Sequence, residues 1–164
     1  MTETAQPSVR QSLAMSDDEV TAFLGEGRRA QVATCGADGW PHVVPLSYML
    51  LDGQVSFWTD GESQKVANLR RDARISVLVE RGNSVEEFRA VLLRGYADVD
   101  DGYESSVAAG CTLFTRYSPV PLPEEALAHI RKLAHQRVTV RVQVEKVVSW
   151  DHRKGAASLE QLGR

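Results

Sequence analysis

Hydrophobic and polar residues alternate over several short stretches of this chain, and turn-forming residues separate these stretches. An alternating period of two is typical of half-buried β-strands. The clearest case starts at Val138, where every second residue through Val144 is a valine and the residues between them are polar. The pattern predicts six strands, at residues 29–35, 41–51, 54–59, 75–79, 88–99 and 138–148.

Two short turns join the first three of these strands. Asp38-Gly39 and Asp52-Gly53 are dipeptides that accept the positive φ angles of tight hairpins. The strands at these turns are therefore expected to pair antiparallel. Pro45 lies inside the second strand and has no N–H to donate, so this strand is expected at an edge, at a bulge or at an opening that faces a ligand.

Four short helices are predicted between the strands. Ser16 and Glu19 have the spacing of a capping box, which starts a helix that buries Val20, Phe23 and Leu24. The other three helices are expected at residues 63–71, 103–117 and 123–135. Gly110 weakens the prediction of a helix at residues 103–117, because glycine disfavours a helix interior. This leaves open whether residues 103–117 form a packed helix or a lid.

These elements predict a mainly β fold with short flanking helices. Closing the strands into an antiparallel, Greek-key-like barrel of six strands removes most exposed sheet edges. The chain has 164 residues, which fits one domain. We expect that domain at residues 15–154, with flexible tails at 1–14 and 155–164.

Composition narrows the classes of function. Hydrophobic residues make up 43% and charged residues 25% of the chain, as in soluble globular proteins, and the formal net charge is −3. A weakly acidic chain has no electrostatic attraction to nucleic acid or anionic lipid. No apolar run approaches the roughly 20 residues that span a bilayer, and residues 1–13 lack the apolar core of a signal peptide. Cys35 and Cys111 lie far apart, which favours reduced thiols in a cytoplasmic protein without a cysteine metal site.

The strongest candidate for chemistry is the junction at residues 57–65, where a strand, a glycine-containing loop and a helix follow one another. Free backbone N–H groups at a helix N-terminus bind anions. Thr59 and Ser63 add hydroxyl groups, and Lys65 adds a positive charge where the helix dipole disfavours one. A bound anion would remove that conflict. A capped surface helix with a solvated lysine explains the same residues about equally well.

The other motifs in the sequence are weaker evidence for a function. Arg70 and Arg71 suit phosphate, but arginines at a helix C-terminus also complement its dipole, so a partly structural role is expected. The four histidines form no metal-ligand pattern. Neither a nucleophile elbow nor a glycine-rich nucleotide-binding motif is present. Hydrolase, kinase and metalloenzyme functions therefore have no support in the sequence.

Five motifs in this order resemble the pyridoxamine 5′-phosphate oxidase-like superfamily of split β-barrels, which bind FMN or the deazaflavin F420. They span residues 38–48, 57–65, 68–79, 94–97 and 147–151. Together they cover most of residues 16–154.

The resemblance implies a homodimer with two cofactor sites at the subunit interface. It implies that Thr59 and Lys65 contact the cofactor phosphate, with Ser63 and Gln64 beside them, and that Trp58 lies beside the cofactor. Trp150, and residues near Arg89, would come from the other subunit. The residues implied along the cofactor ring are His42, Val43, Val44, Pro45 and Ser47. His42, Ser47 and Gln64 stand where the vitamin B6 oxidases carry basic residues, which argues against B6 oxidation.

The implied activity is hydride transfer between FMN or F420 and a small conjugated or aromatic substrate. The cofactor supplies the redox chemistry, and the protein positions its ring and excludes water. No side chain stands out as the acid or base, although Tyr48 and His42 are candidates. The alternatives are a protein that carries flavin, F420 or haem without turnover, and a barrel that has lost its cofactor.

Overall fold

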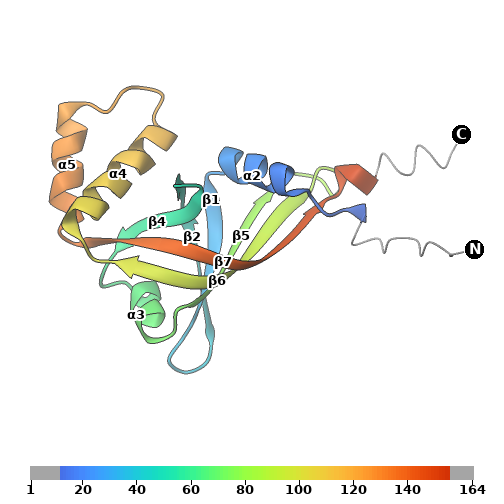
Figure 1. Ribbon diagram of the computed structural model, residues 1–164, viewed down its shortest axis with the longest axis horizontal. Coiled ribbons are helices and arrows are strands. Elements are labelled where there is room, and N and C mark those ends of the chain that lie inside the picture. The colour runs from blue at the N-terminus through green and yellow to red at the C-terminus, as the bar shows by residue number, and fades with distance from the viewer. Residues whose placement is uncertain (1–11, 156–164) are drawn as a thin grey trace, which may run out of the picture.

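The computed structural model describes residues 12–155, so the expected tails lie almost entirely outside the described residues. Its centre is one antiparallel sheet of seven strands in the order β2-β1-β5-β6-β7-β4-β3 (Figure 1). The strands are β1 (Arg29–Cys35), β2 (Pro41–Ser47), β3 (Met49–Leu51), β4 (Gln54–Asp60), β5 (Arg74–Arg81), β6 (Arg89–Asp100) and β7 (Arg137–Asp151). The mainly β prediction is confirmed, and the sheet is the curled half of a split barrel.

The sheet curls because its two edge strands follow one another in the chain. β2 and β3 lie at opposite ends of the strand order, yet only Tyr48 separates them. The prediction of a single strand at residues 41–51, and hence of six strands, was wrong. Tyr48 breaks the run because its side chain is fully buried and its hydroxyl donates a hydrogen bond to the Leu24 carbonyl at 2.7 Å.

The last strand also departs from its simple alternation. The valine face was predicted to be buried as far as Val144, but Val144 is 42% exposed. The reason is that β4 pairs with β7 only as far as Arg141. A bulge in the β6–β7 pairing then falls between Arg94 and Gly95, where a side chain on Gly95 would collide with the Gln143 carbonyl.

The helices that flank the sheet within the described residues are α2 (Asp17–Glu26), α3 (Gln64–Arg71), α4 (Tyr103–Tyr117) and α5 (Glu124–Ala134). The capping box of Ser16 and Glu19 at the start of α2 is confirmed. Residues 103–117 form a packed helix rather than a lid, because α4 packs against α5, β3, β4 and β7. Figure 1 shows this α4–α5 hairpin at one end of the molecule and α3 along the lower side.

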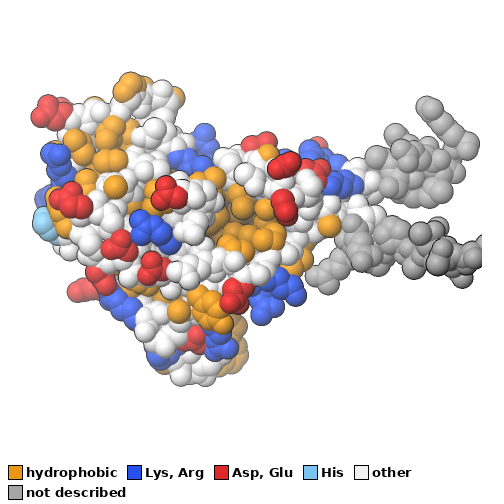
Figure 2. Space-filling view, viewed as in Figure 1, with side chains coloured by type: hydrophobic (Ala, Val, Ile, Leu, Met, Phe, Trp, Pro, Cys, Tyr) orange, Lys and Arg blue, Asp and Glu red, His pale blue; other side chains and the backbone are white. Residues whose placement is uncertain are grey.

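The hydrophobic core fills the inside of the curl. β1 turns Ala30, Val32 and Thr34 inward, as its alternation predicted, and α3 adds Val66 and Leu69. No helix within residues 12–155 is long and apolar enough to cross a membrane. Hydrophobic side chains also remain visible on the surface near the middle of the sheet (Figure 2).

Candidate cofactor site

Thr59 and Lys65 line one cavity at the end of the barrel that α3 covers. β4 turns Thr59 inward, where its side chain is 5% exposed, and the first turn of α3 carries Lys65. Both residues line one small cavity of about 10 Å³, together with Leu46 of β2 and the core side chain Phe57. The sequence motif of a strand, a loop and a lysine thus folds into one local site.

Neither polar group has a protein partner. Within residues 12–155, no hydrogen bond or ion pair reaches the Thr59 hydroxyl or the Lys65 ammonium group. Burial lowers the pKa of Lys65, and the Asp60 carboxylate opposes this shift without forming an ion pair. Arg137 adds to the lowering. A half-buried cation that no carboxylate neutralises is a binding group for an anion.

The loop before α3 leaves further donors free. Ser63 is the N-cap residue, but its hydroxyl donates to the Asp60 carbonyl at 2.7 Å and makes no capping bond. The backbone N–H groups of Gln64 and Lys65 have no acceptor among the described residues. Thr59, Lys65 and these two N–H groups are therefore available to an oxyanion, whereas the Ser63 proton is already donated.

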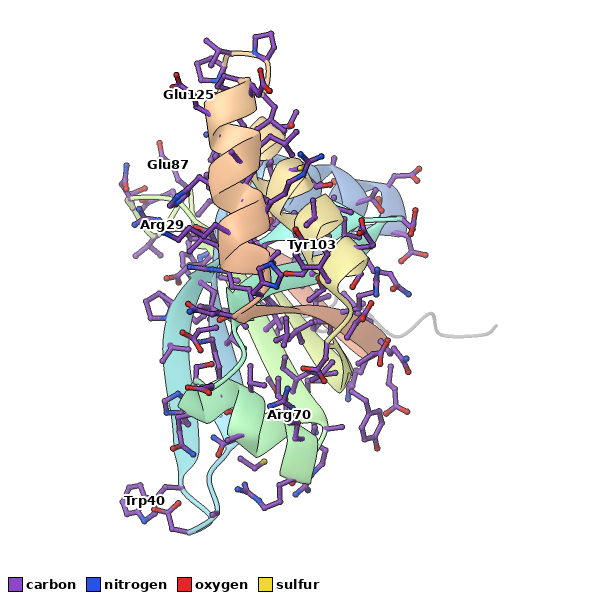
Figure 3. All side chains as sticks on the ribbon, turned by 90° about the vertical axis from the view of Figure 1, so that its left-hand side faces the viewer. Arg29, Trp40, Arg70, Glu87, Tyr103 and Glu125 are labelled. Atoms are coloured by element: carbon purple, nitrogen blue, oxygen red, sulfur yellow. The ribbon has the colours of Figure 1, made fainter. Side chains whose placement is uncertain are left out.

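Buried polar contacts fix the position of α3. The Asn68 side chain is fully buried and donates to the Thr34 hydroxyl at 3.0 Å, and it accepts from Gln64 Nε2 at 2.9 Å. Arg70 donates to the Gly61 carbonyl and pairs with Asp101, and Figure 3 shows Arg70 projecting from α3. Gln64 thus acts within the helix, and the structural interpretation of Arg70 is confirmed.

Arg71 is structural as well. Its guanidinium donates to the Cys35 carbonyl at the end of β1. This contact ties the C-terminal end of α3 to β1. Neither arginine of the pair is therefore free for a phosphate at the opposite end of the helix.

The free edge of β2 runs beside this site. β2 pairs only with β1, and Pro41 and Pro45 stand opposite Cys35 and Gln31. A proline fits an antiparallel edge strand when its nitrogen faces the free edge. Backbone N–H groups alternate in direction along a strand, so the N–H of Val43 points to the free edge as the two proline nitrogens do. It is the only backbone N–H on that edge between Pro41 and Pro45.

The side chains of β2 alternate between the two faces of the sheet. His42 and Val44 stand opposite the buried residues Thr34 and Val32, so they lie on the inner face with Leu46. Val43, Pro45 and Ser47 lie on the outer face, and Val43 is 57% exposed. The structure therefore divides the residues expected along the cofactor ring between two faces.

Trp58 lies on the opposite face of β4 from Thr59. Its Nε1 donates to the Ser106 hydroxyl at 2.8 Å, and the Arg137 guanidinium lies 4.5 Å from the centre of its ring. These contacts hold the indole against α4. The structure does not bring Trp58 together with Thr59 and Lys65.

Trp150 and Arg89 lie at the far end of the molecule. Arg89 stands opposite Asp151 at the end of β7, and Trp150 stands opposite Ala90. Thr59 stands opposite Val138 at the start of the same strand. Twelve residues of β-strand span about 40 Å, so these groups cannot meet Lys65 within one chain.

Comparison with known proteins identifies the family. Residues 16–151 match the family model described as pyridoxamine 5′-phosphate oxidase. A conserved hypothetical protein from Mycobacterium tuberculosis, Rv2991, is 33% identical, with 92% of this chain and 93% of that chain covered and a TM-score of 0.84. The chain belongs to the pyridoxamine 5′-phosphate oxidase family.

More distant structures share the fold. An F420 reductase is 19% identical, with a TM-score of 0.59 over 77% of this chain and 93% of its own. HutZ, a haem storage protein from Vibrio cholerae, is 16% identical, with a TM-score of 0.64 over 84% of this chain and 97% of its own. None of the curated proteins matches this chain. The fold of the family therefore does not by itself decide the ligand.

Sequence reasoning missed Leu46 and Asn68 in this member of the family. Leu46 closes the cavity from β2, and Asn68 sets the position of the helix that carries Lys65. The alternation of β2 could have placed Leu46 inward. A buried asparagine, in contrast, gives no signal in the sequence, because its partner Thr34 is 34 residues away.

Tyr48 is excluded as a proton donor. The phenol is fully buried and bonded to the Leu24 carbonyl, and burial raises its pKa to about 12. Such a group neither reaches a ligand nor exchanges its proton near neutral pH. His42 faces the inside of the sheet, and within residues 12–155 no hydrogen bond orients its ring for catalysis.

Proposed function

We propose that this protein binds FMN or F420 and transfers a hydride between that cofactor and a small conjugated or aromatic substrate. One observation carries the proposal: Thr59 and Lys65, whose hydroxyl and ammonium groups are both unpartnered within residues 12–155, line the same cavity. A half-buried lysine without a counter-ion lowers the stability of the protein alone. An anionic cofactor tail would offset that cost.

The residues fit a phosphate better than they fit a ring. Lys65, Thr59 and the two free N–H groups of α3 offer four donors to phosphate oxygens. The cavity itself, at about 10 Å³, is too small for a flavin. We therefore place the ring outside it, along the free edge of β2, where the Val43 N–H is available and Pro45 leaves its carbonyl unpaired.

A ring at that edge needs a second wall, which we assign to a second copy of the chain. Several large hydrophobic side chains are exposed, among them Trp40 at 76% and Val43 at 57%. Figure 3 shows Trp40 at the tip of the β1–β2 hairpin, away from the body of the molecule. Such patches mark interaction surfaces. A two-fold dimer through them would bring Trp150 and Arg89 of one subunit to the phosphate site of the other.

The cofactor, when bound, supplies two-electron hydride chemistry. The chain's own residues bind and orient the cofactor. Lys65 and Thr59 hold its anionic tail, and the edge of β2 supports its ring. The described site contains no side chain suited to proton transfer, so we assign the proton to solvent. Both cysteines are free, which agrees with the reducing cytoplasm where we place the protein.

The first test is titration of cofactor-free protein with FMN and with F420, followed by fluorescence. Lys65→Ala should weaken binding about 10- to 100-fold, the range of a lost charge-assisted hydrogen bond. Lys132 is an exposed lysine on α5, so Lys132→Ala is the matched control and should leave the cofactor affinity unchanged. Equal affinities of the Lys65→Ala and wild-type proteins would show that the phosphate site is misplaced.

The second test asks whether two chains build one site. Lys65→Ala and Trp150→Ala proteins should each bind the cofactor weakly. After the two are unfolded and refolded together, mixed dimers carry one intact site, so about a quarter of all sites should regain wild-type affinity at equal amounts. No recovery in a protein shown to be dimeric by analytical ultracentrifugation would contradict the composite site.

A turnover assay separates an enzyme from a carrier. Reduced cofactor on the protein is mixed with conjugated or aromatic acceptors, and its absorbance is followed. Repeated reoxidation beyond one equivalent supports an oxidoreductase. A cofactor that stays reduced with every acceptor, on a protein that binds it tightly, would favour the carrier function.

A further inference from the structure

Two like charges face each other on the outer surface of the sheet. Arg94 of β6 and Lys146 of β7 are directly opposite partners in the antiparallel pairing. They share a row across the sheet with Ser76, Ala33 and the exposed Val43, which places them on the outer face. Like charges directly opposite on a sheet destabilise it unless something compensates.

No protein group provides that compensation. Within residues 12–155, neither Arg94 nor Lys146 forms an ion pair or a side-chain hydrogen bond. Glu145 lies nearby and pairs with neither. Arg74, on the same face, behaves differently, because both Asp72 carboxylate oxygens bond to its guanidinium at 2.6–3.1 Å.

The surface around the two cations is concave. Arg94, Lys146, Arg74 and Tyr96 line a cavity of about 500 Å³, together with Cys35. This volume is in the range of small-molecule sites. The bulge between Arg94 and Gly95 shapes one wall, and Tyr96 is 44% exposed, which leaves part of its ring open to a ligand.

The cavity is distinct from the Lys65 site. Lys65 and Thr59 line an inner cavity beneath α3, whereas Arg94 and Lys146 lie on the outer face, and the two cavities share only the core residue Ile75. The chain carries a formal net charge of −3, so two uncompensated cations here form a local exception to its overall charge.

We propose that this outer cavity is a second ligand site, which takes a small organic anion with a flat apolar part. Arg94 and Lys146 bind a phosphate or carboxylate group between them, and Tyr96 contacts the flat part of the ligand. The planar fork of Arg94 suits two oxygens of one oxyanion, and Lys146 supplies a second charge. The cavity is also lined by Pro41 of β2, so the site requires that the proposed dimer leave this part of the outer face open.

The test measures binding by calorimetry in a Lys65→Ala background, in which the other phosphate site is weakened. The probes are phenyl phosphate, benzoate and inorganic phosphate. We expect phenyl phosphate to bind most tightly, Arg94→Gln to weaken it about 10-fold or more, and Lys146→Gln to weaken it by a smaller factor. Arg131→Gln, an exposed arginine on α5 with the same change of charge, is the control and should bind as its parent does.

A second measurement covers the case in which a variant folds poorly. Removal of one of two repelling charges should raise the midpoint of thermal unfolding at low salt for Arg94→Gln, without a rise for Arg131→Gln. Equal binding by the Arg94→Gln and Arg131→Gln proteins, or no binding of any probe at millimolar concentration, would overturn the site. Equal affinity for phenyl phosphate and inorganic phosphate would overturn the role of Tyr96.

Discussion

The guanidinium of Arg116 lies 5.1 Å from the centre of the Tyr48 ring, and it joins three parts of the fold. Its Nη2 donates to the carbonyl oxygens of Leu24, Gly25 and Gly27 at 2.9, 2.9 and 2.6 Å, where α2 ends. Tyr48 donates to the same Leu24 carbonyl. One arginine on α4 therefore fixes the end of α2 and the junction of β2 and β3.

Arg116→Ala should destabilise the protein by about 2–4 kcal/mol, because three carbonyl groups lose a charged donor in a partly buried place. Urea denaturation followed by tryptophan fluorescence measures the free energy of unfolding. Arg131→Ala on the exposed face of α5 should stay within about 0.5 kcal/mol of wild type. A loss for Arg116→Ala no larger than this would show that the carbonyl contacts contribute little.

Stability should fall at alkaline pH through Tyr48. Burial raises its pKa to about 12, and Arg116 opposes this in part. The phenol is thus protonated in the folded state at pH values where the unfolded chain ionises it. This stabilisation is complete below about pH 10 and is lost as pH rises toward 12, by about 2–3 kcal/mol in all.

The measurement compares wild-type and Tyr48→Phe proteins in urea from pH 8 to pH 11.5. The variant lacks the ionising group, so its free energy of unfolding should fall less steeply with pH. Parallel slopes would contradict a raised pKa for Tyr48.

Lys65→Met should raise the thermal unfolding midpoint of the cofactor-free protein. Burial lowers the pKa of Lys65, so the folded state holds its proton less tightly than the unfolded chain. The charged form therefore costs stability at neutral pH, and that cost begins to fall as pH passes the folded pKa and is gone above the unfolded pKa. Methionine keeps the apolar stem and removes the charge.

Calorimetry at pH 7 checks this expectation, with the exposed Lys132→Met as the matched control. A lower midpoint for Lys65→Met than for the control would show that the lysine stabilises the cofactor-free protein. The same variant should bind FMN and F420 weakly, so a gain in stability and a loss of binding are expected together.

Two glycines within helices should respond to alanine in opposite directions. A side chain on Gly110 would lie 2.6 Å from Ile130 and 3.0 Å from Trp58, whereas one on Gly25 would meet nothing within 4 Å. Alanine gains up to about 1 kcal/mol of helix propensity, but overpacking costs about 1–3 kcal/mol. Gly110→Ala should therefore destabilise the protein, and Gly25→Ala should stabilise it slightly.

Chemical denaturation of the two variants beside wild type decides this prediction. A gain for Gly110→Ala would mean that α4 and α5 separate at little cost. In that case the hairpin would be less firmly packed than its contacts with β3, β4 and β7 indicate.

Local patterns predicted most of the elements but not the site they build. The capping box at Ser16 and the alternation of residues 29–35 specify hydrogen bonds and burial within a few residues, so they were read correctly. The break at Tyr48 was missed because its cause lies in α2, at Leu24, and no local signal marks it. The expectation from the resemblance that Trp58 lies beside the cofactor stays a prediction. In the structure Trp58 lies on the other face of β4 from Thr59 and donates to Ser106 of α4.

The order of residues by itself determined the strands apart from the break at Tyr48, the four predicted helices and the presence of a lysine in the first turn of α3. Turn chemistry, alternation and helix capping act over short distances, so they can be recognised in the sequence. Only the tertiary structure decided that Thr59 and Lys65 share a cavity without a counter-ion, and that Arg94 faces Lys146 across two strands. Both relationships depend on the curl of the sheet and its register, which arise from many weak contacts between residues far apart in the chain.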